Sequence, residues 1–182
     1  MHNRIGGIMI TIDGGTGTIL HNGVEIASDK MHDQWVIEND ESISTQTTLT
    51  NWTRSSLSDA APYLTGMGHS SGIFTFPKTG VYRVDFRFGY YKSDHRRYIG
   101  ALIQLSTNSG GSYFDLGRNY THLYDVSSSS TYNNASVYTH VDVQNISTYR
   151  MRFQIVPQDA VTLYGANDDT RTMVTFNRIA NT

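Results

Sequence analysis

Residues 71–91, SGIFTFPKTGVYRVDFRFGYY, constrain the fold of this chain more than any other stretch. Residues 81–88 alternate apolar and charged side chains, so that four apolar side chains share one face of an extended strand. These four are Tyr82, Val84, Phe86 and Phe88. A shorter alternation at 73–76 precedes them across a turn, where Pro77 fixes φ and Gly80 tolerates a positive φ. The stretch predicts two half-buried antiparallel strands joined without a helix.

Similar alternations recur through most of the chain. Strands are predicted at residues 35–37, 43–49, 51–54, 98–105, 137–143, 149–155, 161–164 and 172–179. Short turns separate them, as at 108–111, and we find no segment with a helical period of 3.6 residues. Charged residues make up 16% of the chain and there are 12 Tyr, which favours extended structure with a polar, weakly charged surface. The pattern predicts an all-β antiparallel sandwich of about ten strands.

The N-terminal residues form a separate pattern. Two glycine turns, at 13–15 and 22–23, divide alternating apolar residues into a three-stranded β-meander. Three such short strands are marginally stable alone, so we expect this element to pack on another surface. Its attachment residues are predicted to be Ile8, Ile10, Ile12, Val24 and Ile26. The predicted division is an attachment element with a polar linker at 1–33, and a head domain at 34–182.

Composition excludes several classes of protein. The chain has no cysteine, which rules out disulfide scaffolds and thiolate metal sites. A net charge of −2 without a basic stripe argues against nucleic-acid binding. No apolar run is long enough to span a membrane, and residues 1–15 lack the pattern of a secretory signal.

No catalytic constellation is predicted, and the chain is expected not to be an enzyme and to need no cofactor. Residues 68–72, GHSSG, match the nucleophile elbow Gly-x-Ser-x-Gly, which would make Ser70 the nucleophile. That elbow requires a helix after the serine, whereas a strand is predicted here. The seven histidines show no metal-ligand spacing. Calcium binding by the oxygens at 13–15 or 167–169 is a minor alternative that stays open.

Two segments have the composition of recognition loops. Residues 113–138 are rich in Tyr, Ser and Asn, and residues 92–97 contain the chain's one local basic cluster. Tyr offers rigid amphipathic contact area, whereas Ser and Asn form adaptable hydrogen bonds. The alternatives are a plain polar surface and packing on a neighbouring subunit. The candidate recognition residues are His95, Arg96, Arg97, Tyr113, Tyr120, Tyr124 and Tyr132.

A framework within residues 72–86 resembles a known family motif. It consists of Gly72, Phe74, Pro77, Gly80, Tyr82 and Phe86. This spacing is similar to the central motif of the globular heads of the complement first-component q subunit, which share a jelly-roll fold with the tumour necrosis factors. Residues 50–54 and 172–179 resemble that family's early and last strands, and the similarity covers about residues 35–180.

The resemblance implies a ten-stranded jelly roll that assembles as a homotrimer. The residues expected in the core or along the trimer axis are Phe74, Phe76, Tyr82, Phe86, Phe88, Phe153 and Phe176. The chain differs from secreted animal members because it lacks a collagen-like stalk and cysteine. With its short β-meander it looks more like trimeric virion proteins of tailed phages.

The expected function is therefore a non-enzymatic structural component on the surface of a bacteriophage virion, assembled in the host cytoplasm. It would be a head decoration or a short fibre, docked on other virion proteins through its N-terminal residues. The alternative is the receptor- or glycan-binding tip of a tail fibre. Neither membrane insertion nor nucleic-acid binding is expected.

Overall fold

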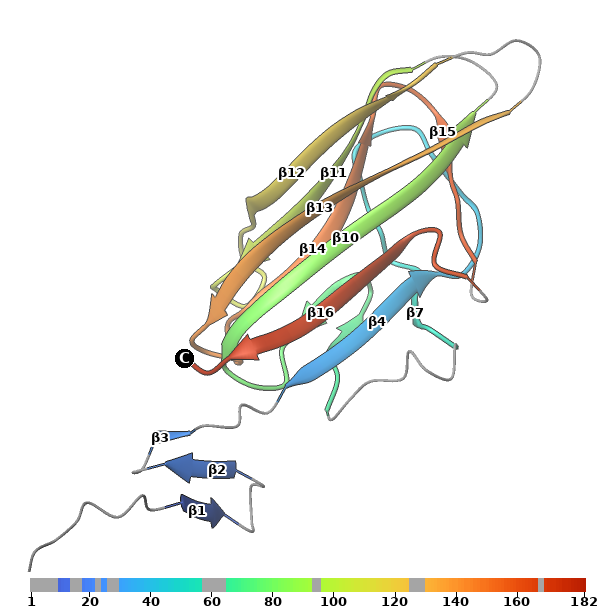
Figure 1. Ribbon diagram of the computed structural model, residues 1–182. Coiled ribbons are helices and arrows are strands. Elements are labelled where there is room, and N and C mark those ends of the chain that lie inside the picture. The colour runs from blue at the N-terminus through green and yellow to red at the C-terminus, as the bar shows by residue number, and fades with distance from the viewer. Residues whose placement is uncertain are drawn as a thin grey trace, which may run out of the picture.

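The computed structural model describes residues 10–13, 18–21, 24–25, 30–56, 65–92, 96–124, 130–166 and 169–182. In these ranges every element is a β-strand and every strand pair is antiparallel (Figure 1). The described residues accordingly include no helix that could cross a membrane.

The first three strands form a sheet of their own. β1 (Ile10–Asp13), β2 (Thr18–His21) and β3 (Val24–Glu25) are ordered β1-β2-β3, with Ile10 opposite His21. This is the predicted meander, and none of its described strands pairs with a strand of the other two sheets. Ile10, Ile12 and Val24 lie in it, whereas Ile8 and Ile26 fall outside the described residues.

A seven-stranded sheet forms one layer of the head. Its order is β5-β15-β10-β16-β4-β7. β15 and β16 pair with different parts of β10, at residues 90–91 and 81–87, and β13 pairs with β10 along residues 80–92. The strands are β4 (Met31–Ile37), β5 (Glu41–Ile43), β7 (Trp52–Arg54), β10 (Gly80–Lys92), β13 (Thr131–Val143), β15 (Val161–Leu163) and β16 (Met173–Ala180).

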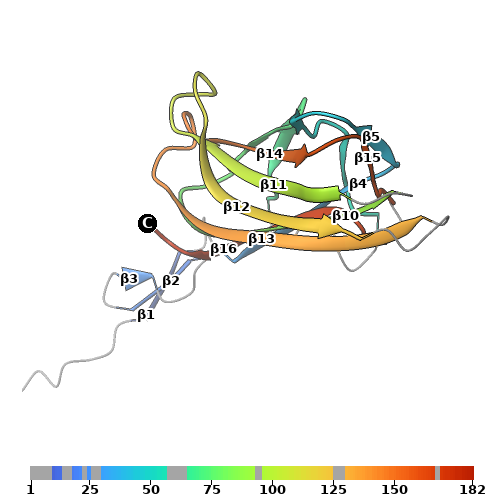
Figure 2. The same cartoon turned by 90° about the horizontal axis from the view of Figure 1, so that it is seen from above.

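A six-stranded sheet forms the second layer. Its order is β12-β11-β14-β9-β8, and β6 pairs with β14. The strands are β6 (Thr47–Thr48), β8 (Gly68–Ser70), β9 (Ile73–Thr75), β11 (Arg96–Ser106), β12 (Phe114–Leu123) and β14 (Arg150–Pro157). Figure 2 shows β12 and β13, the outermost strands of the two layers, next to each other. The predicted all-β sandwich is confirmed, and short strands such as β6 and β8 raise the strand number above the expected ten.

The turn at residues 77–80 connects the two layers. β9, before the turn, pairs with β14 and β8, whereas β10, after it, pairs with β13, β15 and β16. The two strands of residues 71–91 are therefore joined by a short connection, as predicted, yet they do not pair with each other. Gly80 adopts φ 135°, the positive value expected there.

Aromatic side chains fill the space between the sheets. The ring of Phe74 lies at the centre, 5.4 Å from Trp35, 5.5 Å from Phe153 and 5.1 Å from Phe176 between centroids. The seven aromatic residues predicted for the core or the trimer axis are all buried inside one protomer. They are Phe74, Phe76, Tyr82, Phe86, Phe88, Phe153 and Phe176. Within a protomer these side chains form the core, so any trimer surface must come from other residues.

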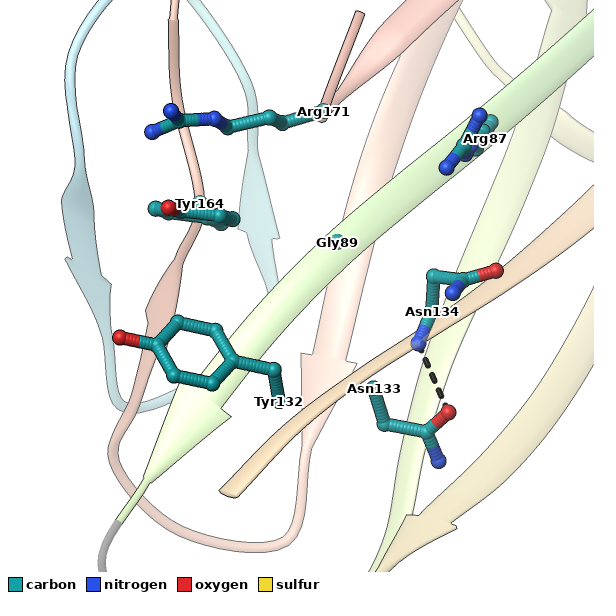
Figure 3. Close-up of a pocket in the computed structure, with 7 residues that line it drawn as sticks. All are labelled: Arg87, Gly89, Tyr132, Asn133, Asn134, Tyr164 and Arg171. Carbon is teal, nitrogen blue, oxygen red and sulfur yellow. Dashed lines mark hydrogen bonds between the residues drawn. The ribbon is translucent and has the colours of Figure 1, made fainter. Parts of the chain in front are cut away.

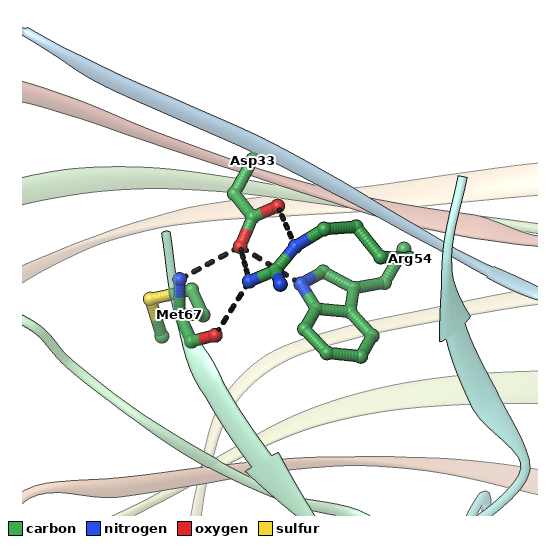
Figure 4. A network of polar contacts seen from close by, with 4 residues as sticks. Asp33, Arg54 and Met67 are labelled. Carbon is green, nitrogen blue, oxygen red and sulfur yellow. Dashed lines mark hydrogen bonds and ion pairs between the residues drawn. The ribbon is translucent and has the colours of Figure 1, made fainter. Parts of the chain in front are cut away.

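A buried carboxylate ties the edge of this core together (Figure 4). Asp33 is fully buried on β4 and accepts two hydrogen bonds from Arg54 at 3.0 Å, one from the Trp35 indole at 2.9 Å and one from the Met67 amide at 2.7 Å. Charge-assisted bidentate pairs of this kind are stronger than neutral hydrogen bonds. The predicted boundary after residue 33 therefore lies too late, because β4 begins at Met31 and Asp33 belongs to the sandwich.

The segment that matches the nucleophile elbow is a β-hairpin. β8 and β9 pair directly, and the two turn residues Ser71 and Gly72 have φ values of 50° and 81°. Positive φ at both central positions is the mark of a type I′ turn. The His69 Nε2 atom accepts a hydrogen bond from the Gly72 amide at 3.0 Å, and Ser70 lies on β8 with a strand following the turn. The geometry is that of a tight turn, and the predicted strand follows it in place of the helix that the elbow requires.

Candidate binding site

Exposed aromatic side chains gather where the outermost strands of the two sheets meet. β12 and β13 are joined by side-chain hydrogen bonds, from Asn119 to the Ser136 carbonyl at 2.6 Å and from Asn133 to the His122 carbonyl at 2.7 Å. Five exposed aromatic residues lie on or beside these strands: Phe114, Tyr120, Tyr124, Tyr132 and Tyr138. We call the four that do not line the pocket described below, Phe114, Tyr120, Tyr124 and Tyr138, the β12–β13 edge.

The prediction of loops at 113–138 and 92–97 was wrong for most of its residues. Tyr120 lies in β12, Tyr132 lies in β13, and Arg96 and Arg97 begin β11. A high content of Ser, Asn and Tyr concealed these strands. Most of their residues are polar on both faces, so the sequence lacks the alternation of apolar and polar residues that marks a strand. His95 and the side chain of Arg96 lie outside the described residues.

The predicted recognition residues separate into different places. Tyr120 packs edge-on against Tyr98 on the six-stranded sheet, with ring centroids 5.9 Å apart. Tyr113 is half-buried under the Arg152 guanidinium, which lies 4.0 Å from its ring centroid. Arg97 is exposed on β11, and Tyr124 is exposed directly after β12. Only Tyr132 lines the pocket described next.

A pocket of about 410 Å³ lies on the outer face of the seven-stranded sheet (Figure 3). It is lined by Arg87, Gly89, Tyr132, Asn133, Asn134, Tyr164 and Arg171. In Figure 3, Arg171 lies over Tyr164 on one side of Gly89, and Arg87 and Asn134 lie on the other. Its volume falls within the range of about 300–1,000 Å³ that is usual for small-ligand sites.

The strand register builds this pocket. Gly89 on β10 stands opposite Asn134 on β13, and Arg87, two residues earlier, faces outward with it. Because Gly89 has no side chain, it leaves a hollow in the sheet face. The Tyr164 amide donates to the Gly89 carbonyl at 2.8 Å, and the buried Thr172 hydroxyl accepts from the Gly89 amide at 3.1 Å. These bonds fix the floor of the pocket.

Two tyrosines, Tyr132 and Tyr164, line the pocket, and Tyr91 packs against both of them. The ring centroids of Tyr91, Tyr132 and Tyr164 lie 5.0, 5.3 and 5.6 Å apart. The Tyr91 hydroxyl donates to Asp40 at 2.9 Å, and this hydrogen bond raises the pKa of Tyr91 above its usual value. Tyr132 is 58% exposed, so much of its surface remains open to solvent.

Two guanidinium groups supply the charge of the pocket. The Arg171 guanidinium lies 4.0 Å from the Tyr164 ring centroid, and its Nε donates to Asp169 at 2.7 Å. Arg87 is exposed and makes no ion pair with any residue that the structure describes. The seven lining residues include no carboxylate, and Arg87 gives the pocket a positive charge that no described ion pair balances, whereas Asp169 balances Arg171.

Sequence reasoning missed most of this pocket. Arg87 was recognised only as part of a solvent-facing strand surface, and Tyr164 and Arg171 were not singled out. The one available signal was Gly89, which interrupts the large side chains of 81–91 and indicates a hollow or a close approach.

No metal site emerges from the described part of the chain, where no group of three His, Asp or Glu residues is placed to hold an ion. The two calcium alternatives include Gly14, Gly15, Asn167 and Asp168, which lie outside the described residues.

The sandwich, its strand order and its connections define a jelly roll of the tumour necrosis factor type. The structure of Eiger TNF from S. frugiperda is similar with a TM-score of 0.61 and 16% identity, over 84% of this chain and 93% of that one. Murine APRIL at pH 8.0 is similar with a TM-score of 0.59 and 14% identity, over 82% of this chain and 99% of that one. Murine APRIL at pH 5.0 gives a TM-score of 0.58 at 13% identity, over 81% and 99% of the two chains.

The structural similarity shows the fold alone, because the sequence identities are only 13–16%. No family model matches the sequence, and no curated protein matches it significantly.

Proposed function

We propose that this protein is a non-enzymatic, homotrimeric component of a bacteriophage virion, docked on the particle surface by its N-terminal strands. It serves as a head decoration or a short fibre. Its action is mechanical: the heads associate through exposed side chains, and three N-terminal elements dock together, which increases avidity without new contacts.

The observation that carries this proposal is the β12–β13 edge. Four of the eight large exposed apolar side chains in the described residues lie there, although one sandwich already buries a full aromatic core. Exposed aromatic side chains on two adjoining outermost strands indicate an interaction surface. A closed symmetric oligomer buries the same patch on every subunit, and the resemblance of residues 72–86 to trimeric heads favours three.

The N-terminal sheet supports docking. Its described strands pair only with one another, and a sheet of three strands with two to four residues each requires a partner surface for stability. Because β4 begins at Met31, residues 1–30 can be removed without cutting a strand of the head.

Two measurements test the proposal. Sedimentation equilibrium of the full chain should give a mass near three chains, and a monomer at micromolar concentration would contradict the trimer. Deleting residues 1–30 should leave the oligomer intact and abolish incorporation into particles. A truncated chain that still enters particles would show that docking uses the head.

A second candidate function is recognition of a host receptor or glycan. The pocket, with the Arg87 charge and its two tyrosines, favours it, because binding sites combine such apolar area with a few convergent polar groups. Host-cell adsorption by the isolated protein tests this function. Absence of adsorption, together with loss of capsid stability when the protein is removed, would exclude it.

A further inference from the structure

We propose that the pocket around Gly89 binds an acidic saccharide, with its carboxylate on Arg87 and its ring on Tyr132. This inference rests on the second candidate function, recognition, and assigns that function a place and a ligand class. Four features of the pocket lead to it.

The charge of the pocket selects an anion. Arg87 and Arg171 both line it, and no lining residue is acidic. Arg171 is held in place by Asp169 and by the Tyr164 ring, so its position is fixed while Asp169 balances its charge. Arg87 is exposed without an ion-pair partner among the described residues, so its planar donors are available for a carboxylate, which they bind in a bidentate manner.

The tyrosines of the pocket select a ligand with an apolar face. Tyr132 packs on Tyr91 and Tyr164, which fix the orientation of its ring, and more than half of its surface is exposed. A rigid, amphipathic tyrosine provides contact area with little loss of side-chain entropy. The C–H face of a sugar ring fits such a surface, whereas a free inorganic anion would gain nothing from it.

An unused carboxamide supplies hydroxyl recognition. The Asn133 side chain is already engaged, since it donates to the His122 carbonyl and accepts from the Asn134 amide. The Asn134 carboxamide is exposed and has no hydrogen-bond partner among the described residues. One carboxamide offers both donors and an acceptor, which matches the paired hydroxyls of a sugar.

The glycine floor selects the size of the ligand. A Cβ atom added at Gly89 would lie 3.1 Å from the Arg171 carbonyl oxygen, so any side chain there would crowd the hollow between the arginines. The volume of about 410 Å³ accommodates one or two sugar rings. A carboxylate beside Arg87, a ring on Tyr132 and a hydroxyl near Asn134 together describe a uronic or sialic acid.

The test is a titration of the full chain with methyl glucuronide, followed by calorimetry and ligand-observed NMR. Methyl glucoside has the ring without the charge, and acetate has the charge without the ring. We expect glucuronide to bind at least about tenfold more tightly than either, because each lacks one of the two contacts. Equal binding of glucuronide and glucoside, or no saturable binding of glucuronide up to about 20 mM, would overturn the proposal.

Variants locate the site. Arg87→Gln and Tyr132→Ala should each weaken glucuronide binding by at least about tenfold. Arg83→Gln is the matched control, since Arg83 lies four residues earlier on the same face of β10 and pairs with Asp85. It should change binding less than about twofold, and an equal loss in Arg83→Gln and Arg87→Gln would show general electrostatic attraction instead of a site. Circular dichroism and unfolding midpoints confirm that each variant is folded.

Host-cell adsorption by the same variants tests the saccharide site separately from the recognition function on which it rests. If Arg87→Gln and Tyr132→Ala still adsorb to cells, the protein recognises the host, but through a site other than this pocket. Wild-type protein that binds glucuronide but adsorbs to no cell would retain the site and exclude the recognition function.

Discussion

At the scale of single residues, Asp33 shows how one buried charge can organise a sandwich edge. It joins β4 to β7 through Arg54 and to the segment before β8 through the Met67 amide. The Arg54 guanidinium also lies 4.5 Å from the Trp35 ring centroid, so the same cation covers the indole. Gly66 is required beside this network, because a Cβ there would approach Asp33 Oδ2 to 2.4 Å.

Removing this carboxylate should destabilise the fold strongly. We expect Asp33→Ala to lower the free energy of unfolding by about 3–5 kcal/mol, since three donors lose their acceptor inside the protein. The control is Asp85→Ala, which breaks the exposed Arg83–Asp85 pair and should cost about 1 kcal/mol or less. Urea unfolding measures both, and equal costs would show that the Asp33 network is not structurally important.

His69 should make stability depend on pH. Burial lowers the pKa of His69 below 6.5, and its Nε2 accepts a hydrogen bond that a protonated ring cannot accept. The unfolded chain therefore binds the proton more readily than the folded chain, so stability is full above pH 6.5 and falls as the pH drops below it. Urea midpoints at pH 7.5 and 5.5 should differ more for the wild type than for His69→Gln. Identical differences in the two proteins would contradict this assignment.

At the scale of elements, turns determine which strands pair. The Ser71–Gly72 turn returns the chain at once and gives the β8–β9 hairpin, because both residues adopt a positive φ. The four-residue connection at 76–79, only slightly longer, sends the chain into the opposite sheet. Pairing partners thus depend on turn geometry as well as on strand pattern.

Gly72 should tolerate no side chain. Its φ is 81°, and an added Cβ would lie 2.5 Å from the Leu49 carbonyl oxygen. We expect Gly72→Ala to lower the free energy of unfolding by about 1–3 kcal/mol. Gly111→Ala is the control, since its added Cβ would meet only the Asn108 side chain and backbone, at 3.3 Å and beyond. Thermal unfolding compares the two, and a larger loss for Gly111→Ala would refute the argument.

At the scale of the whole molecule, the proposed trimer depends on apolar side chains that are exposed to solvent in a single protomer. Tyr138 is 64% exposed on β13, the strand that closes the seven-stranded sheet beside β12. An aromatic side chain in that position contributes little to the protomer and much to an interface.

Tyr138→Ser should therefore weaken the oligomer while the protomer stays folded. We expect sedimentation to show dissociation at a protein concentration at which the wild type remains assembled. Ile146→Ser serves as the control, because Ile146 is an exposed apolar residue outside the β12–β13 edge, in the turn after β13. If both variants sediment like the wild type, the β12–β13 edge is not the contact between subunits.

The sequence by itself determined the strands and their buried faces. Alternation has a period of two residues, which is a local property, and the faces of Tyr82 to Phe88 and of Ile99 to Leu105 are buried as predicted. It also determined the turn at 108–111, because positive φ favours Gly at particular positions. The prediction failed at 115–134, where polar strands resemble loops in composition.

Only the tertiary structure decided which strands share a sheet and which side chains share a site. Asp33 looked like part of a polar linker until folding brought Arg54 and the Met67 amide to it. Likewise Arg87, Tyr132 and Arg171 are far apart along the chain, and the register of β10 with β13 and the return of the chain into β16 place them around Gly89. Such contacts depend on long-range pairing, which is fixed by the packing of the whole core and leaves no periodic signal in the sequence.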